Sequence, residues 1–237
     1  VLFIIKLFDF FYKKKIFKFL KKKGFDNIEI LIDVGAHKGE SIQLFLDNMN
    51  VAKIISFEAS PVNFKFLREK ESFFLNKYKD TKIIIENIAL GRENKKESFK
   101  QFKESSSSTI NSINLKSPYY KKKLKYLNFL KNEKLFEIFE IQITRLSDYL
   151  GDNAIKNIDF LKIDTEGYEY EVLLGLNKKI LDTKIIMFEH HYDNMINKNY
   201  SFSDINKLLV KNKFKMIFKA KMPFRKTFEY IYINEGF

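Results

Sequence analysis

Short aliphatic runs separated by stretches with helical periodicity restrict the fold of this chain more than any other feature. Five runs have the composition of buried strands and are bounded by turn residues: 28–34, 53–59, 81–90, 158–164 and 183–191. A strand that is apolar along its whole length is covered on both faces, as in a parallel sheet between helices. The alternation therefore predicts an α/β domain on a mostly parallel sheet.

Two other stretches complete this pattern, and one breaks it. Apolar and polar residues alternate in 136–150, which predicts a strand with an exposed edge, and again in 229–234, which predicts a last strand. Residues 92–137 are charged and contain the run SSSST at 105–109. We expect this segment to be an irregular, variable insertion in the domain.

The connection after the first run, from Asp33 to Gly39, contains an acid and two glycines. Glycine allows a ligand to approach the backbone closely, and open parallel sheets bind ligands beyond the carboxyl ends of their strands. The third glycine of the dinucleotide fingerprint is missing, and so is the Gly-Lys-Ser/Thr ending of a P-loop. Asp33 suits a ligand that carries an ammonium group. The alternative is an ordinary turn between strand and helix.

A second acid, Glu58, ends the second run, nineteen positions after Gly39. A carboxylate at this place can accept hydrogen bonds from the two hydroxyls of a ribose. A ligand with an adenosine, a cationic amine and no pyrophosphate fits both acids, and S-adenosylmethionine is such a ligand. Glu58 could instead cap the following helix, but the two acids at this spacing favour the cofactor.

Five motifs then occur in a familiar order. They are DVGAHKGE at 33–40, FEASP at 57–61, NIALG at 87–91, DFLKIDTEGYEYEVLLG at 159–175 and FEHH at 188–191. This set resembles the FkbM family of class I methyltransferases, over about residues 28–191. The resemblance implies a Rossmann-like, seven-stranded, mostly parallel sheet with helices on both faces and an antiparallel last strand. It also implies S-adenosylmethionine as the methyl donor and O-methylation of a hydroxyl on a sugar, a glycan or a related metabolite.

The resemblance also assigns positions to the cofactor. It implies that Asp33, Gly35, Ala36 and Gly39 surround the methionine and the sugar. Glu58 and Ala59 would lie at the ribose, and Asn87 and Ala89 near the adenine. These implied cofactor-binding residues, together with Asp164, are expectations for the structure.

Methyl transfer to an alcohol needs a base that removes the hydroxyl proton. Candidates follow the fourth and fifth strands: Asp164, Glu166, Glu189, His190 and His191. We expect His190 to be the base because an ordinary histidine pKa of ~6.5 suits neutral pH; a hydrogen-bonded wall residue is the alternative. Asp164 would contact the cofactor or orient the base. Glu166 would be catalytic or would cap the next helix from its first turn.

A metal could assist this chemistry. Mg²⁺ held by Asp164, Glu189 and His190 would lower the pKa of the acceptor hydroxyl. The spacing of these residues does not require an ion, so we expect no metal site.

Three further residues have less specific interpretations. We expect His37 to face solvent or the carboxylate of the cofactor. Ser107 and Ser108 would lie in a polar linker or line the site.

Two other functions stay open. Methyltransferases that modify a nucleic-acid base commonly carry an Asn-Pro-Pro-aromatic motif, whereas this chain has Asp-Thr-Glu-Gly at 164–167. A nucleic-acid acceptor is therefore disfavoured. A non-catalytic module that binds S-adenosylmethionine is the other alternative, and the intact Asp33 and Glu58 argue against it. The oligomeric state is not predicted.

The first 23 residues hold eight lysines and one acid, so they supply +7 of the net charge of +13. We expect residues 1–24 to be a basic, aromatic, helical appendage and 25–237 to be the methyltransferase domain, with 92–137 on the acceptor side. The appendage would pack on the domain. Peripheral contact of 1–23 with anionic lipid is the alternative, because Phe, Leu and Ile alternate there with Lys.

Neither a secretory signal nor a membrane-spanning helix is expected in this segment. Its charges follow the apolar stretch, and Lys6 and Asp9 interrupt a run too short to span a bilayer. The chain has no cysteine. We expect a cytoplasmic protein, with the inner face of the membrane as the alternative location.

Overall fold

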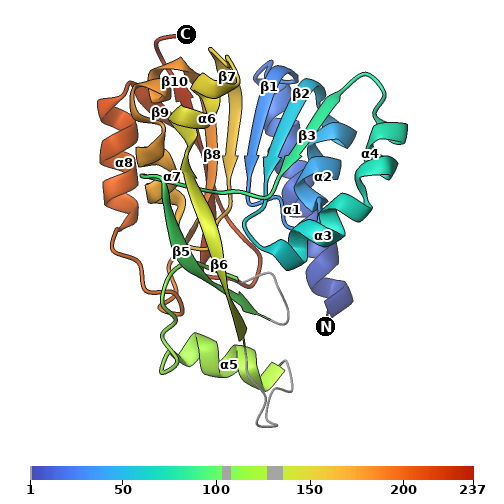
Figure 1. The fold of residues 1–237 in the computed structure, drawn as a ribbon. Coiled ribbons are helices and arrows are strands. Elements are labelled where there is room, and N and C mark those ends of the chain that lie inside the picture. The colour runs from blue at the N-terminus through green and yellow to red at the C-terminus, as the bar shows by residue number, and fades with distance from the viewer. Residues whose placement is uncertain (1, 103–107, 127–135) are drawn as a thin grey trace.

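A seven-stranded sheet forms the centre of the computed structural model, which describes residues 2–102, 108–126 and 136–237 (Figure 1). Its strand order is β3-β2-β1-β7-β8-β10-β9. Its strands are β1 (Asn27–Val34), β2 (Asn50–Phe57), β3 (Lys82–Glu86), β7 (Ile158–Ile163), β8 (Thr183–His191), β9 (Phe214–Lys221) and β10 (Thr227–Asn234). β10 is antiparallel to both neighbours, and the other pairs are parallel. The predicted Rossmann-like fold class is confirmed.

Helices cover both faces of this sheet, each over its own hydrophobic core. The α1/α2 face is covered by α1 (Leu2–Lys22), α2 (Glu40–Asn48), α3 (Pro61–Glu69) and α4 (Glu71–Lys77). The α7/α8 face is covered by α6 (Leu146–Asp152), α7 (Glu169–Gly175), the 3-10 helix η1 (Asn177–Asp182) and α8 (Phe202–Lys211). The strand order reverses between β1 and β7, which is where open α/β sheets bind ligands.

A second, three-stranded sheet packs on the α7/α8 face, and the sequence did not predict it. It consists of β4 (Ala89–Gly91), β5 (Lys95–Phe102) and β6 (Phe136–Arg145), with β6 in the centre. The expected exposed edge on β6 and the expected irregular structure at 95–102 are therefore wrong. β5 was missed because its buried side chains are confined to its last four residues, while its first half consists of two lysines, a glutamate and a serine. The helix α5 (Pro118–Tyr126) also lies in this segment.

The helix α1 packs on the domain along one side. Tyr12, Ile16, Phe17 and Leu20 are buried in the core of the α1/α2 face. The Tyr12 hydroxyl donates a hydrogen bond of 3.1 Å to the Ala220 carbonyl. No helix in the described part of the chain combines the length and the apolar character needed to span a bilayer.

Candidate active site

Charged side chains from four strands meet at the carboxyl edge of the sheet, all on the α1/α2 face. Asp33 of β1 is in register with Lys162 of β7, and Glu189 of β8 lies opposite Glu229 of β10. Alternation along the strands places Asp164 and His191 on the same face. We call these six residues the polar row: Asp33, Lys162, Asp164, Glu189, His191 and Glu229.

The carboxylate of Asp33 binds an ammonium group, as expected, but this group is the side chain of Lys162 and not part of a ligand. Lys162 Nζ lies 3.1 Å from Asp33 Oδ1, 3.6 Å from Asp164 Oδ2 and 3.2 Å from the Gly35 carbonyl oxygen. The other carboxylate oxygen of Asp33 accepts a 2.6 Å hydrogen bond from Ser41 Oγ. Burial lowers the pKa of Lys162, yet the two carboxylates raise it more, so the ammonium stays charged. Asp33 thus positions Lys162 and the turn that follows β1.

The two glycines of this turn leave space for neighbouring atoms of the protein itself. Gly35 has φ +85°, and a Cβ there would lie 1.8 Å from the carbonyl oxygen of Asp164. At Gly39, with φ +87°, a Cβ would lie 2.7 Å from the ring of Phe74. Both positions therefore need glycine because of the backbone conformation and the close packing. Packing within the protein thus accounts for the two glycines, and their place beside the cofactor stays a prediction.

Glu58 directly follows β2, the strand that pairs with β1, and is almost completely buried. Its carboxylate accepts hydrogen bonds from the backbone N–H groups of His37, at 2.7 Å, and of Ser60, at 2.9 Å. Burial raises the pKa of Glu58 to about 7, against the opposing effect of these hydrogen bonds. Oε1 accepts from Ser60 and, at 3.5 Å, from Asn63, whereas Oε2 accepts from His37 alone among the described residues. The second lone pair of Oε2 could therefore accept one further hydrogen bond, as from a ribose hydroxyl.

The other implied cofactor positions lie around Glu58 in different environments. Ala36 is buried and donates its N–H to the Phe57 carbonyl, while Ala59 is half-buried. The exposed Asn87 donates a 2.8 Å hydrogen bond to the Glu58 carbonyl. Ala89 is buried in β4, within the core of the α7/α8 face. Of the two residues expected near the adenine, Asn87 has the accessible side chain.

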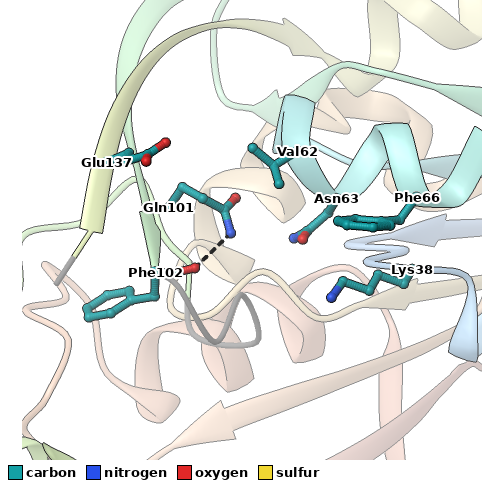
Figure 2. A pocket seen from close by; sticks show the side chains of 7 residues that line it. All are labelled: Lys38, Val62, Asn63, Phe66, Gln101, Phe102 and Glu137. Carbon is teal, nitrogen blue, oxygen red and sulfur yellow. Dashed lines mark hydrogen bonds between the residues drawn. The ribbon is translucent and has the colours of Figure 1, made fainter. Parts of the chain in front are cut away.

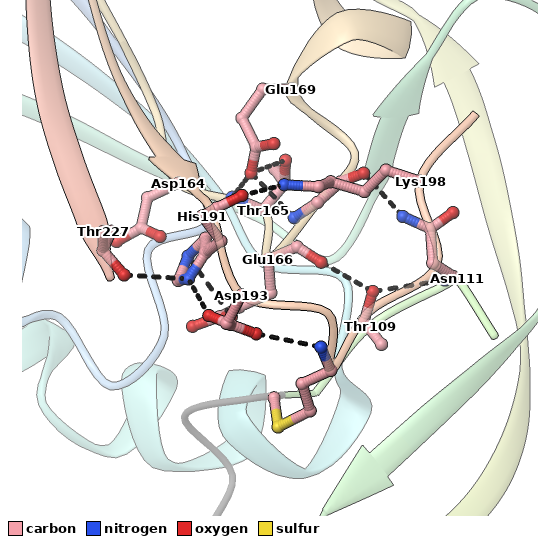
Figure 3. Close-up of polar contacts among 12 residues, drawn as sticks. Thr109, Asn111, Asp164, Thr165, Glu166, Glu169, His191, Asp193, Lys198 and Thr227 are labelled. Atoms are coloured by element: carbon pink, nitrogen blue, oxygen red, sulfur yellow. Dashed lines mark hydrogen bonds and ion pairs between the residues drawn. The ribbon is translucent and has the colours of Figure 1, made fainter. Parts of the chain in front are cut away.

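His191 is the histidine that faces the other charges of the site (Figure 3). Its Nε2 lies 3.5 Å from Glu166 Oε2, and its Nδ1 lies 3.0 Å from Thr227 Oγ1 and 3.8 Å from Asp193 Oδ2. Burial lowers the pKa of this imidazole, but Glu166, Asp193 and other carboxylates raise it to about 10. His191 is therefore an imidazolium at neutral pH in the free protein. Among the described residues, none forms a hydrogen bond with its Nε2.

His190, the expected base, points to the opposite face of β8. Its ring is 3% exposed and lies 4.8 Å from the ring of Tyr192, 5.9 Å from that of Tyr200 and 6.0 Å from that of Phe202. Burial, with the nearby Lys198 and His191, lowers its pKa to about 3. A histidine in these surroundings is a wall residue and a very weak base, so the expectation for His190 is corrected. For the same reason Asp164, Glu189 and His190 do not converge on one metal ion.

The two carboxylates that follow β7, Asp164 and Glu166, differ in their surroundings. Burial raises the pKa of Asp164, but Lys162 and other cations lower it further, so the group is a carboxylate. Glu166 does not lie in the first turn of a helix, because α7 begins at Glu169, and the capping role considered for it is wrong. Its φ of +51° instead turns its side chain toward His191.

The turn at 164–168, between β7 and α7, is held in place by residues that the sequence did not indicate. Glu169 is fully buried and accepts hydrogen bonds from the N–H groups of Thr165 and Gly167 and from the Tyr200 hydroxyl. Thr109 Oγ1 donates a 2.8 Å bond to the Glu166 carbonyl, and Asn111 Nδ2 donates a 2.5 Å bond to that of Gly167. Thr109 is the last residue of the SSSST run, which was the one available signal. These contacts fix the backbone on which Glu166 faces His191.

Of the residues with less specific interpretations, His37 places its Nδ1 3.2 Å from Glu40 Oε2. Ser108 Oγ accepts a 3.0 Å bond from the Phe102 N–H, while Ser107 lies outside the described residues. Over the described ranges, no group of three or more His, Asp or Glu side chains is arranged to hold a metal ion.

The helix α1 contributes a cation to the site. Lys13 is half-buried, and Glu229, Glu189 and Asp164 raise its pKa although burial lowers it. The paired Glu189 and Glu229 are themselves nearly fully buried. Burial and the neighbouring Asp164 raise the pKa of Glu189 to about 8. Sequence reasoning missed this link because it treated residues 1–24 as an appendage.

A pocket of about 260 Å³ opens beside Glu58, between α3 and the small sheet (Figure 2). It is lined by Lys38, Val62, Asn63, Phe66, Gln101, Phe102 and Glu137. Asn63 and Gln101 connect it to Glu58, because Asn63 Nδ2 lies 3.5 Å from Glu58 Oε1 and Gln101 accepts a hydrogen bond from Ser60. The pocket therefore borders the Glu58 side of the site, and no residue of the polar row lines it.

Comparison with known proteins places these features in context. The sequence matches the methyltransferase FkbM domain over residues 33–216. No curated protein matches the sequence.

Two methyltransferases are among the solved structures that share the fold. The methyltransferase FkbM from Methylobacillus flagellatus KT is 13% identical, with a TM-score of 0.56 over 88% of this chain and 44% of that chain. This chain thus spans less than half of that protein. The magnesium protoporphyrin IX methyltransferase (ChlM) from Synechocystis PCC 6803, solved with bound SAM, is 8% identical, with a TM-score of 0.55 over 98% of this chain and 82% of that chain.

Proposed function

Because the chain belongs to the FkbM family of S-adenosylmethionine-dependent methyltransferases, we propose that it methylates a hydroxyl of a sugar, a glycan or a related metabolite. The observation that carries this proposal is the polar row, which collects carboxylates and one imidazole at the carboxyl edge where the strand order reverses. Such groups suit the transfer of a hydroxyl proton.

The residues at this edge fit S-adenosylmethionine by their chemistry. Oε2 of Glu58 offers an unused lone pair for a ribose hydroxyl, and Asn87 offers an exposed amide beside it. Asp164 is a carboxylate at the end of β7, beside the switch point of the sheet, and suits the positive part of the ligand. When bound there, the cofactor supplies an electrophilic sulfonium methyl group and one positive charge.

We assign the proton acceptor to His191. Its Nε2 is directed at Glu166, and Thr227 and Asp193 hold the other ring nitrogen, so the ring has a defined orientation. With a pKa of about 10 in the free protein, the ring is protonated at neutral pH and cannot act as a base. A cation bound beside the same carboxylates would lower this pKa, because like charges disfavour each other. The neutral ring could then accept the hydroxyl proton, with Glu166 stabilising the imidazolium that results.

The pocket beside Glu58 supports a sugar-like acceptor. Its lining combines the rings of Phe66 and Phe102 with the amides of Asn63 and Gln101 and the carboxylate of Glu137. Aromatic faces and planar hydrogen-bonding groups are what a polyhydroxylated ring requires of its binding site. Three of these residues, Gln101 and Phe102 on β5 and Glu137 on β6, lie in the 92–137 segment, the region expected to shape the acceptor side.

A transfer assay tests the proposal. The protein is incubated with S-adenosylmethionine labelled on the methyl group and with nucleotide sugars, cell-surface polysaccharides, RNA or DNA. We expect label on a carbohydrate hydroxyl. Label found on nucleic acid alone would overturn the acceptor class, and cofactor binding without transfer to any of these acceptors would favour a binding module. A rate that rises with pH, and a rise that disappears in His191→Gln, would support the assigned base.

A further inference from the structure

Three phenylalanine rings are exposed where α1 meets the hairpin between β9 and β10. Phe8 and Phe11 of α1 are 47% and 57% exposed, and Phe224 at the hairpin is 71% exposed. The rings of Phe8 and Phe224 meet edge to face, with their centroids 5.3 Å apart. Large exposed apolar groups gathered from two elements mark an interaction site more often than scattered ones do.

The two elements are held together as one surface. Arg225 NH2 forms a 2.9 Å ion pair with Asp9 of α1, and the Tyr12 hydroxyl binds the Ala220 carbonyl on β9. Phe224 has φ +60°, which is a rare conformation for a bulky residue. Residues in strained conformations cluster at functional sites, and Phe224 lies midway along the connection between β9 and β10.

Lysines surround the rings. Helical spacing puts Lys14, Lys15 and Lys18 on the side of α1 that carries Phe11, and all three are exposed. Lys221 and Lys226 are exposed at the base of the hairpin. The nearby acid Asp9 is already paired with Arg225. We call this region the α1–hairpin surface: Phe8, Phe11, Lys14, Lys15, Lys18, Lys221, Phe224 and Lys226.

This surface adjoins the candidate active site. Thr227 comes three residues after Phe224, and its Oγ1 lies 3.0 Å from Nδ1 of His191. Lys13, between Phe11 and Lys14 on α1, lies within the electrostatic influence of Glu189 and Glu229. The amino end of α1 lies toward the carboxyl edge of the parallel strands (Figure 1).

We propose that the α1–hairpin surface binds an anionic phospholipid bilayer and holds the active-site edge against it. Phenylalanines would enter the boundary between headgroups and acyl chains while the lysines bind lipid phosphates, which is how interfacial helices attach. The charge would also attract nucleic acid. The rings favour the bilayer, because Phe8 and Phe224 pack against each other and do not stand apart as platforms for stacked bases.

Vesicle cosedimentation of the full chain tests this proposal without methyl transfer, so its failure would leave the proposed function standing. Vesicles are made of phosphatidylcholine alone or of phosphatidylcholine with phosphatidylglycerol. We expect binding to the anionic vesicles, and a loss of at least about tenfold in Phe11→Ser/Phe224→Ser and in Lys14→Glu/Lys15→Glu.

Matched controls lie on α8. Val210 is 57% exposed, like Phe11, and Lys207 and Lys211 are exposed, so Val210→Ser and Lys207→Glu/Lys211→Glu repeat the chemical changes away from the surface. Both should bind vesicles like the unchanged protein, and circular dichroism should show all variants folded. Equal binding by all variants, no preference for anionic vesicles, or binding to RNA but not to vesicles would each overturn the proposal.

Discussion

At the carboxyl edge of the large sheet, one face carries charged side chains and the other carries apolar ones. On the α1/α2 face, residues at the carboxyl ends of β1, β7 and β8 and near the start of the antiparallel β10 form the polar row, with Lys13 beside it. On the α7/α8 face, apolar side chains continue to the edge: Val34, Ile163, Phe188 and Tyr230 are all buried in one core. Charge is therefore concentrated on the face that we propose holds the cofactor, and the other face supports it by packing.

The neighbouring histidines at the end of β8 show how strongly the face decides chemistry. His190 lies among aromatic rings and has a pKa of about 3, whereas His191 lies among carboxylates and has a pKa of about 10. One step along a strand reverses the direction of a side chain. The comparison teaches that position in a motif identifies a candidate residue only after its face is known.

The largest expected effect is on kcat, when each of these two histidines is replaced in turn by another residue. His191→Gln should lower kcat by at least about 100-fold, because it removes the proton acceptor. His190→Phe keeps a ring among rings and should leave kcat close to its original value. Steady-state kinetics with an identified acceptor measures both. The opposite order of effects would show that the wrong face has been assigned to the chemistry.

Removing the cation that α1 contributes should weaken the fold. Lys13→Met leaves Asp164, Glu189 and Glu229 with less compensating charge and should lower the free energy of unfolding by about 2 kcal/mol. The loss should be larger at pH 9 than at pH 6, because the pKa of Glu189 is about 8. Lys14→Met, on the exposed side of the same helix, should change it by less than about 0.5 kcal/mol. Equal losses in urea unfolding would contradict a specific role for Lys13.

Per pH unit, the free energy of unfolding should change by at most about 1.4 kcal/mol for each histidine, and in opposite directions of pH for the two. The raised pKa of His191 stabilises the fold fully below pH ~6.5, and this contribution is lost as the pH rises through about 10. The lowered pKa of His190 affects stability in the acid range. The contribution of this histidine is lost as the pH falls from ~6.5 toward 3.

Urea unfolding across this range checks both directions. His191→Gln should flatten the alkaline loss of stability, and His190→Phe should flatten the acid loss. A variant that changes neither slope would show that its histidine has an ordinary pKa.

Local patterns and motifs predicted the large sheet well. The five aliphatic runs correspond to buried strands because a strand covered on both faces is apolar throughout. The run at 81–90, however, divides into β3 and β4, which belong to different sheets. The same continuous apolarity hides which face each residue takes, so the histidines of FEHH could not be assigned without the neighbouring strands.

Contacts between distant segments could not be predicted. Thr109 and Asn111 bind the backbone at 166–167 across more than 50 residues of sequence, and nothing local indicates this contact. Lys13 reaches Glu189 and Glu229 only because α1 docks on the sheet. β5 has too few buried side chains to show strand periodicity, so its place beside β6 came from the structure alone.

Titration calorimetry with S-adenosylhomocysteine tests most directly whether carboxylates on the α1/α2 face hold the cofactor. Glu58→Gln and Asp164→Asn should each weaken binding by about tenfold or more, because hydrogen bonds to charged groups are lost. Asp159→Asn is the control, because Asp159 lies at the amino end of β7 and binds the Ile30 N–H.

The control should bind like the unchanged protein. Binding by the unchanged protein should also be tighter at pH 8 than at pH 6, because the pKa of Glu58 is about 7. Unchanged affinity in both Glu58→Gln and Asp164→Asn would contradict the account.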